Sequence, residues 1–210
     1  MRINTSKTKK AGAFTLIEMI GVLAVIAILA SFLIPKVFNA INDARINSAI
    51  VGAETVKTAV VDHYGKWGRF DSSNGVVIAT FTTPVDGYDT NILMGESLLD
   101  KPYATKAGTN NWVRVAACPA GTIVVDGTST KGYNLSGNAG GLNEATGTYF
   151  VEAVIQGVAE ADAQAISQRI DGPTLSVTTG ATADTRGRVM YAAPVSAGGA
   201  CEVHIYLAHR

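Results

Sequence analysis

Glu18 has the most distinctive chemical setting in this sequence, because it is the single charged side chain in the apolar stretch from Phe14 to Pro35. With a rise of ~1.5 Å per residue, a helix over this stretch would be about 30 Å long, which matches the hydrocarbon core of a bilayer. A carboxylate inside such a segment costs about 2.5–3.5 kcal/mol at mid-membrane and therefore suggests a function. The alternative is an ordinary membrane anchor or signal peptide in which Glu18 lies close to the interface.

The residues around this stretch argue against the alternative. The stretch is too long for a secretory signal peptide, and no small-residue cleavage site follows it. A short basic segment without acidic residues, residues 1–13, precedes Phe14. Phe14 at the junction, Glu18 four residues later and Pro35 at the end of the apolar run closely resemble the N-terminus of type IV prepilins. In that family a dedicated peptidase removes a basic leader directly before a Phe, and the apolar helix that follows carries the Glu and the Pro.

The resemblance implies that residues 1–13 are a leader, removed by a prepilin peptidase, and that the new Phe14 amine is N-methylated. The family usually has Gly directly before the cut, whereas here Ala13 separates Gly12 from Phe14. A cut after Gly12 would place Glu18 one position too far along, so we expect cleavage between Ala13 and Phe14. Both the Phe14 amine and the Glu18 carboxylate would carry a desolvation penalty if unpaired in a dry fibre core. We therefore expect the amine of one subunit to pair with Glu18 of its neighbour during assembly.

The charges are distributed unevenly between the leader and the remainder. The whole chain has a formal net charge of zero, and the leader holds four of its 17 Lys and Arg, so the mature chain would carry a net charge of −4. The basic leader predicts that the N-terminus faces the cytoplasm and that the rest of the chain lies outside it. No basic patch stands out, so a dedicated nucleic-acid surface is not expected.

Two cysteines, Cys118 and Cys201, lie in the part that would be exported. An even number of cysteines in an oxidising compartment predicts a disulfide, here between these two residues. They lack Cys-x-x-Cys spacing and a nearby pair of histidines, so a metal site is a poor interpretation.

No other residues form a convincing catalytic set. The three histidines, His63, His204 and His209, are expected to have no metal-binding or catalytic role. His63 is expected on the polar side of a helix end, and His204 on a strand. The pair Asp86 and Asp89 is better explained by a turn than by a calcium site, because the segment lacks the ligand density of an EF-hand loop. The chain contains neither a Gly-x-Ser-x-Gly turn nor a phosphate-binding glycine loop. We expect no enzyme activity, no cofactor and no metal.

A long N-terminal helix is expected to continue beyond the membrane segment. Apolar residues recur at three- and four-residue steps along one face, which predicts an amphipathic half packed on a globular head; they are Ile46, Ile50, Ala53, Val56, Val60 and Tyr64. Pro35 removes a backbone donor, so a kink is expected there, with local unwinding between Gly21 and Pro35 on assembly. The run Gly65 to Gly68 ends the helix.

The remainder of the chain is rich in glycine and β-branched residues and is expected to form a sheet, with Trp67 and Trp112 filling its core. Expected strands cover residues 75–83, 112–117, 122–126, 148–156, 188–192 and 202–207, with a second helix over residues 160–170 and an exposed loop over residues 132–147. The fold class is therefore α+β, a long N-terminal helix packed on an antiparallel β-sheet head. The expected organisation is a leader (1–13), a helix (14–66, with its transmembrane half at 14–35) and a β-rich head (67–210).

The resemblance implies a structural subunit that is held in the inner membrane and polymerises into a helical, type IV pilus-like filament of identical copies. The implied partners are membrane lipid, the prepilin peptidase, and an inner-membrane assembly platform with its ATPase. Two alternatives remain open: the major pseudopilin of a type II secretion system, and a membrane-anchored adhesin or sugar-binding module.

Overall fold

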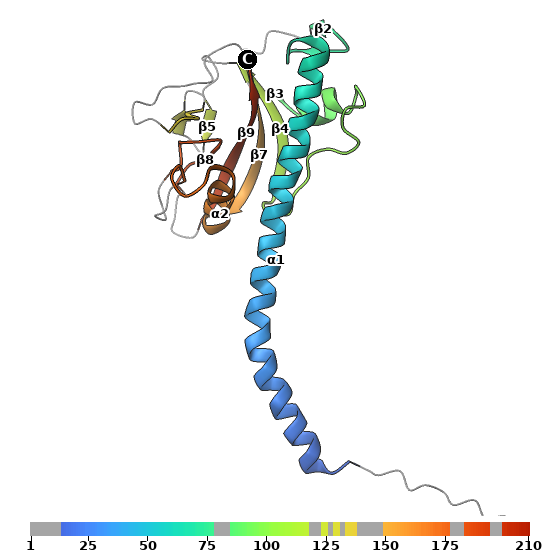
Figure 1. Ribbon diagram of the computed structural model, residues 1–210, viewed down its shortest axis with the longest axis vertical. Coiled ribbons are helices and arrows are strands. Elements are labelled where there is room, and N and C mark those ends of the chain that lie inside the picture. Colours follow the sequence, from blue (N-terminus) through green and yellow to red (C-terminus); the bar gives the residue numbers. More distant parts are fainter. Residues whose placement is uncertain are drawn as a thin grey trace, which may run out of the picture. The chain divides into compact units, whose positions relative to one another are not determined.

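The computed structural model describes residues 14–77, 85–117, 123–125, 128–130, 133–137, 149–176, 183–193 and 199–210. The chain forms two compact units, which meet between Ile41 and Asn42. Helix α1 (Leu16–Trp67) contributes to both (Figure 1). The boundary between the units therefore lies within the helix. The predicted organisation into a leader, a helix and a head stays a prediction.

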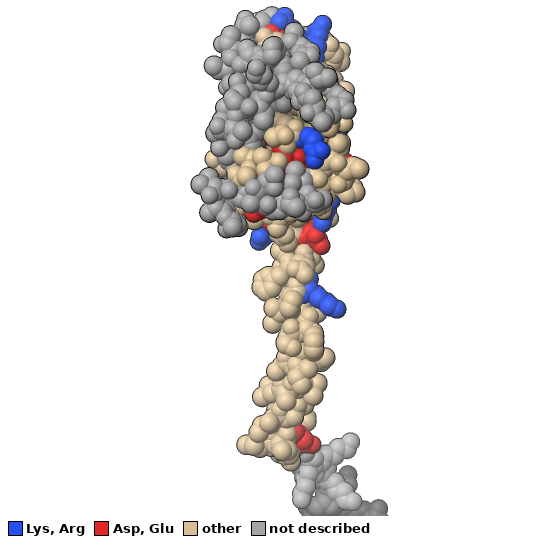
Figure 2. All heavy atoms as spheres, turned by 90° about the vertical axis from the view of Figure 1, so that its left-hand side faces the viewer, with Lys and Arg blue, Asp and Glu red and all other residues tan. Residues whose placement is uncertain are grey.

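The first unit consists, in its described part, of the N-terminal portion of α1. Among the described residues, α1 is the one helix that is long and apolar enough to cross a membrane. Its large apolar side chains up to Ile41 are between 45% and 78% exposed. Figure 2 shows this portion almost free of charged side chains. The helix continues through Pro35, and the predicted kink and unwinding stay predictions.

The second unit begins with the amphipathic part of α1. Its buried residues follow the predicted three- and four-residue spacing; they are Ile46, Ala49, Ala53, Val56, Ala59, Val60 and His63. The prediction for His63 was wrong, because its side chain lies within this apolar stripe and is fully buried. The predicted helix end is confirmed: α1 stops at Trp67, and Gly68, with φ of 70°, donates its N–H to the Tyr64 carbonyl at 2.7 Å.

A five-stranded antiparallel sheet with the order β3-β4-β7-β9-β8 forms the centre of the second unit. The strands are β3 (Val85–Asp86), β4 (Asn110–Ala117), β7 (Tyr149–Ala159), β8 (Val189–Tyr191) and β9 (Ala200–His209). The C-terminal half of α1 packs on one face of this sheet (Figure 1). The predicted α+β class is confirmed.

Smaller elements surround the sheet. A hairpin of β1 (Ser72–Ser73) and β2 (Val76–Val77) follows α1, and the short π-helix η1 (Asp89–Leu93) follows β3. Helix α2 (Glu160–Asp171) follows β7, as predicted. Strands β5 (Ile123–Val125) and β6 (Thr128–Thr130) pair with each other.

Three expectations about the head need correction. The strand predicted over residues 75–83 is represented by β2 alone, which belongs to a hairpin, while residues 78–83 lie outside the described part. The segment 132–147 is not simply an exposed loop, because Tyr133 and Asn134 are buried. Trp67 and Trp112 are only half-buried, so neither fills the core.

The sheet is buried on both faces. On the α1 side, the core contains Val113 and Val115 of β4 with Val151 of β7. On the opposite face, Tyr133 packs on Phe150 in a smaller cluster, with ring centroids 5.8 Å apart. Several side chains that point away from α1 are therefore also buried, including the polar Glu152 and His204.

Candidate assembly site

The N-terminus of α1 carries the residues for which the sequence predicts chemistry. Phe14 precedes the helix and is 77% exposed. Thr15 donates to one Glu18 carboxylate oxygen twice, from its backbone N–H at 2.8 Å and from its hydroxyl at 2.7 Å. The Glu18 N–H in turn donates to the Thr15 hydroxyl at 3.3 Å. This reciprocal arrangement is a capping box, in which two helix-end donors are satisfied by side chains.

The capping box gives Glu18 a role within its own helix that the sequence interpretation missed. The signal was available, because Thr15 and Glu18 have the Thr-x-x-Glu spacing that marks a helix start. A carboxylate has about four acceptor positions, and Thr15 uses two of them on one oxygen. The carboxylate therefore retains acceptor capacity for an amine from another molecule while it caps the helix.

The other predicted site residues are only partly described. Cys201 is buried on β9 beside Val158 of β7. Cys118, together with the leader residues Gly12 and Ala13, lies outside the described residues, so the predicted disulfide and the cleavage bond remain predictions.

The two acidic residues weighed as a calcium site do not converge. Asp86 accepts from Arg114 at 2.6 Å, whereas Asp89 accepts from the backbone N–H of Tyr103 at 2.8 Å. Among the described residues, no three Asp, Glu, His or Cys side chains lie together in a way that could hold a metal ion.

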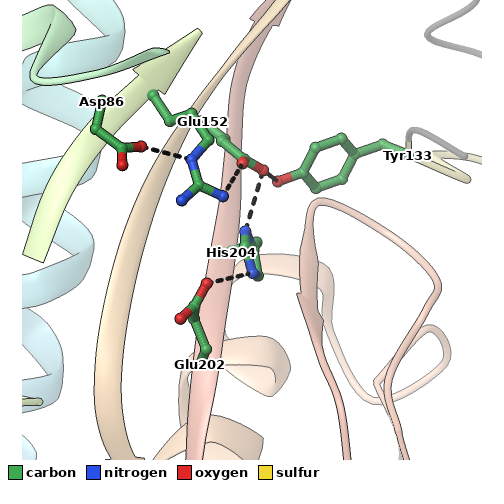
Figure 3. Close-up of polar contacts among 6 residues, drawn as sticks. Asp86, Tyr133, Glu152, Glu202 and His204 are labelled. Carbon is green, nitrogen blue, oxygen red and sulfur yellow. Dashed lines mark hydrogen bonds and ion pairs between the residues drawn. The ribbon is translucent and has the colours of Figure 1, made fainter. Parts of the chain in front are cut away.

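A network of charged side chains crosses the sheet on the face opposite α1 (Figure 3). Arg114 on β4 bonds Asp86 on β3 and lies 3.8 Å from a Glu152 oxygen on β7. The other Glu152 oxygen accepts from the Tyr133 hydroxyl at 2.6 Å. Glu152 is 1% exposed and is thus a buried charge held by three different elements. Single-sequence reasoning missed it, because Glu152 lies within an otherwise apolar strand.

His204 completes this network on β9. Its Nδ1 lies 3.3 Å from Glu152 and its Nε2 lies 3.3 Å from Glu202. Two carboxylates at this distance, one on each side of the ring, favour the charged form of the imidazole. Burial opposes this charge, but Glu152 and Glu202 outweigh it and raise the pKa of His204 to about 9.

A second buried carboxylate, Glu96, joins three segments around the end of α1. One of its oxygens lies 2.9 Å from His63 Nδ1 and accepts from Trp67 Nε1 at 2.8 Å. The other accepts from the backbone N–H of Asn74, in the turn of the β1–β2 hairpin, at 2.6 Å. Burial acts to raise the pKa of Glu96, but these three donors outweigh it and lower the pKa below its usual value.

The comparisons with known proteins concern the N-terminal part of the chain. Residues 8–34 match the family described as "Prokaryotic N-terminal methylation motif". The chain is 39% identical over 66 residues to a "Type IV major pilin protein PilE1" of Neisseria gonorrhoeae, an alignment that covers 30% of this chain and 40% of the relative.

It is also 37% identical over 70 residues to a "Fimbrial protein" of Neisseria meningitidis serogroup A, across 32% of this chain and 41% of that relative. The chain thus spans about two fifths of the length of the curated relatives it matches. No solved structure matches the chain significantly.

Proposed function

We propose, because the chain belongs to the type IV prepilin family, that it is a pilin subunit which polymerises from the inner membrane into a type IV pilus-like filament. The family is structural and not enzymatic, which agrees with the lack of a catalytic set in the sequence. The observation that carries the proposal is an α1 segment whose apolar side chains are exposed, with one carboxylate at its N-terminal end.

The physical basis is the similarity between lipid and a helical fibre core as surroundings for this segment. A helix satisfies its own backbone groups, so the segment is stable in a bilayer as a monomer. Packed among copies of itself, it exchanges lipid contacts for protein contacts at a modest net cost. Apolar contacts alone therefore provide little net driving force for assembly. Assembly requires an energy source, and it requires a register signal, which is a contact that aligns each new subunit with its neighbours.

Glu18 supplies the register signal in this proposal. After removal of residues 1–13 by the prepilin peptidase, Phe14 would begin the chain with a positively charged, N-methylated amine. This amine would pair with Glu18 of a subunit already in the filament, because an unpaired charge in the fibre core is costly. An inner-membrane platform and its ATPase would extract the subunit, whose head lies outside the cytoplasm before assembly and on the pilus surface afterwards.

The capping box allows an experiment that separates two roles of Glu18. Glu18→Gln keeps the side-chain cap but removes the charge, whereas Glu18→Ala removes both. If charge pairing drives assembly, both variants should reach the membrane as cleaved subunits and both should lose most of their sheared filaments. Normal filament yield from Glu18→Gln with loss in Glu18→Ala would leave capping as the role of Glu18 and contradict charge pairing.

The two alternatives predict different phenotypes on deletion of the gene. A pilus subunit predicts loss of surface filaments in electron micrographs. The major pseudopilin of a type II secretion system predicts a secretion defect without long fibres, and a membrane-anchored adhesin or sugar-binding module predicts that filaments persist.

A further inference from the structure

We infer that a polar clasp between α1 and α2 fixes the point at which the exposed stem of the subunit ends and its rigid head begins. The clasp consists of Asn42, Asp43 and Asn47 on α1 and of Asp162 and Arg169 on α2. It belongs to the folded monomer, so the inference holds whether or not the chain polymerises.

The clasp is built from short contacts between two helices that are distant in sequence. Arg169 donates from Nη2 to the Asp43 carboxylate at 2.6 Å and from Nη1 to the Asn47 side-chain oxygen at 2.6 Å. Its Nη1 also lies 3.4 Å from the Asp43 carbonyl oxygen. Asn42 donates to the Asp162 carboxylate at 2.5 Å. One guanidinium group therefore spans a full turn of α1, since residues four apart lie one above the other on a helix.

The clasp lies at the start of the second unit. This unit begins at Asn42, the first clasp residue. All large apolar side chains from Phe14 to Ile41 are exposed, and Ile46 is the first fully buried apolar residue of the helix. Asn42 and Asp43 thus come before Ile46 along the chain, and Asn47 follows directly after it. The clasp holds the helical turn that would otherwise be the frayed end of the head.

This position gives the clasp a mechanical consequence. Loss of helical structure that begins near Pro35, where a backbone donor is missing, would spread toward the head one turn at a time. Before it reached Ile46, it would have to separate Asn42 from Asp162 and Arg169 from Asp43, and the bond from Arg169 to Asn47 holds the next part of the same turn. A planar guanidinium group suits this task, because its fork contacts two acceptors in a fixed geometry. The clasp therefore acts as a stop that keeps such changes within the stem.

Hydrogen exchange on the full chain in detergent micelles tests the inference directly. In Arg169→Ala, amides of residues 42–48 should exchange about fivefold faster than in the wild type, because partly exposed ion pairs contribute modestly. Peptides from β7 and β9 should be unchanged. Gln168→Ala is the matched control, since Gln168 is exposed on the same helix and its side chain is not part of the clasp.

Two further variants make the result decisive. Arg169→Lys keeps the charge without the fork, so it should restore no more than half of the lost protection. Asn47→Ala removes one acceptor from the α1 side and should give a smaller increase at the same amides, even if Arg169→Ala does not fold. Equal exchange at residues 42–48 in Arg169→Ala and Gln168→Ala, or full restoration by lysine, would overturn the inference. None of these measurements depends on filaments, so failure of the clasp and failure of the pilin proposal are distinguishable.

Discussion

The imidazole of His204 is buried between two carboxylates, and we expect the head to lose part of its stability at alkaline pH for this reason. Its pKa is about 9 in the folded chain, whereas the pKa of an unfolded histidine is about 6.5. A raised pKa contributes stability that is fully present below the unfolded value and is lost as the pH rises through the folded value. We therefore expect the free energy of unfolding to decrease by at most about 3 kcal/mol between pH 7 and pH 10. The denaturant midpoint should decrease over the same pH range.

The comparison with two variants identifies the titrating group. His204→Gln should be less stable than the wild type at pH 7, because Glu152 and Glu202 lose their counter-charge, and its midpoint should change little up to pH 10. His209→Gln is the control, because His209 is exposed near the end of the same strand. A wild-type alkaline loss that persists undiminished in His204→Gln would assign the effect to another group.

At the scale of single residues, the sequence predicted roles correctly where a role depends on residues nearby in the chain. The positions of Phe14 and Glu18 indicated the N-terminal methylation motif that matches residues 8–34. His63 was misplaced because it is polar, although its spacing from Val60 and Ala59 puts it on the buried face. Its partner Glu96 lies 33 residues away in sequence, and no local pattern reveals such a pairing.

At the scale of elements, Glu96 connects the end of α1 to the β1–β2 hairpin. Glu96→Gln replaces one accepting oxygen with a donor, so at least one of the donors from His63, Trp67 and Asn74 would lose its partner. Loss of a hydrogen bond to a charged group costs about 1.5–3 kcal/mol. We expect a loss of this size in the unfolding free energy, together with faster exchange of the Asn74 amide.

The effect of Glu96 on the pH dependence has the opposite sign to that of His204. Because the pKa of Glu96 is lowered in the folded chain, its contribution to stability is present above the unfolded pKa of about 4.5. That contribution is lost as the pH falls through the folded pKa. The acid-sensitive part of the stability should thus shrink in Glu96→Gln. Asp100→Asn, at an exposed position in the same segment, should leave both stability and acid sensitivity unchanged.

The regular elements were largely predictable, because their signals are local periodicities. The long helix, α2, β4, β7 and β9 follow from spacing and β-branched content. The hairpin, β3 and η1 were not predicted, since they are short and are held by contacts such as the Asn74–Glu96 bond. The burial of the far sheet face was also missed, because Tyr133 reaches it from a glycine- and asparagine-rich segment.

At the scale of the whole molecule, the division of α1 between two units relates the fold to the proposed life cycle. The segment up to Ile41 has exposed apolar side chains and suits lipid or other copies, whereas the segment from Asn42 is packed into the head. A subunit of this kind can change its surroundings without unfolding its head. The same division predicts that processing at the N-terminus acts on the first unit alone.

The mature chain should begin at Phe14, and intact mass measured on membrane-held and filament-held protein tests this. We expect the mass of residues 14–210 plus one methyl group on the new amine. A cut after Gly12 would retain Ala13 and give a chain one alanine heavier. That additional residue would rotate the amine by about 100° around the helix relative to Glu18 and move it along the axis, so the pairing geometry would be lost.

Ala13→Gly is the matched variant, because it places the usual glycine before Phe14, and we expect it to be cleaved at the same bond. A wild-type chain that starts at Ala13 and still forms filaments would contradict both the cleavage bond and the proposed register between Phe14 and Glu18.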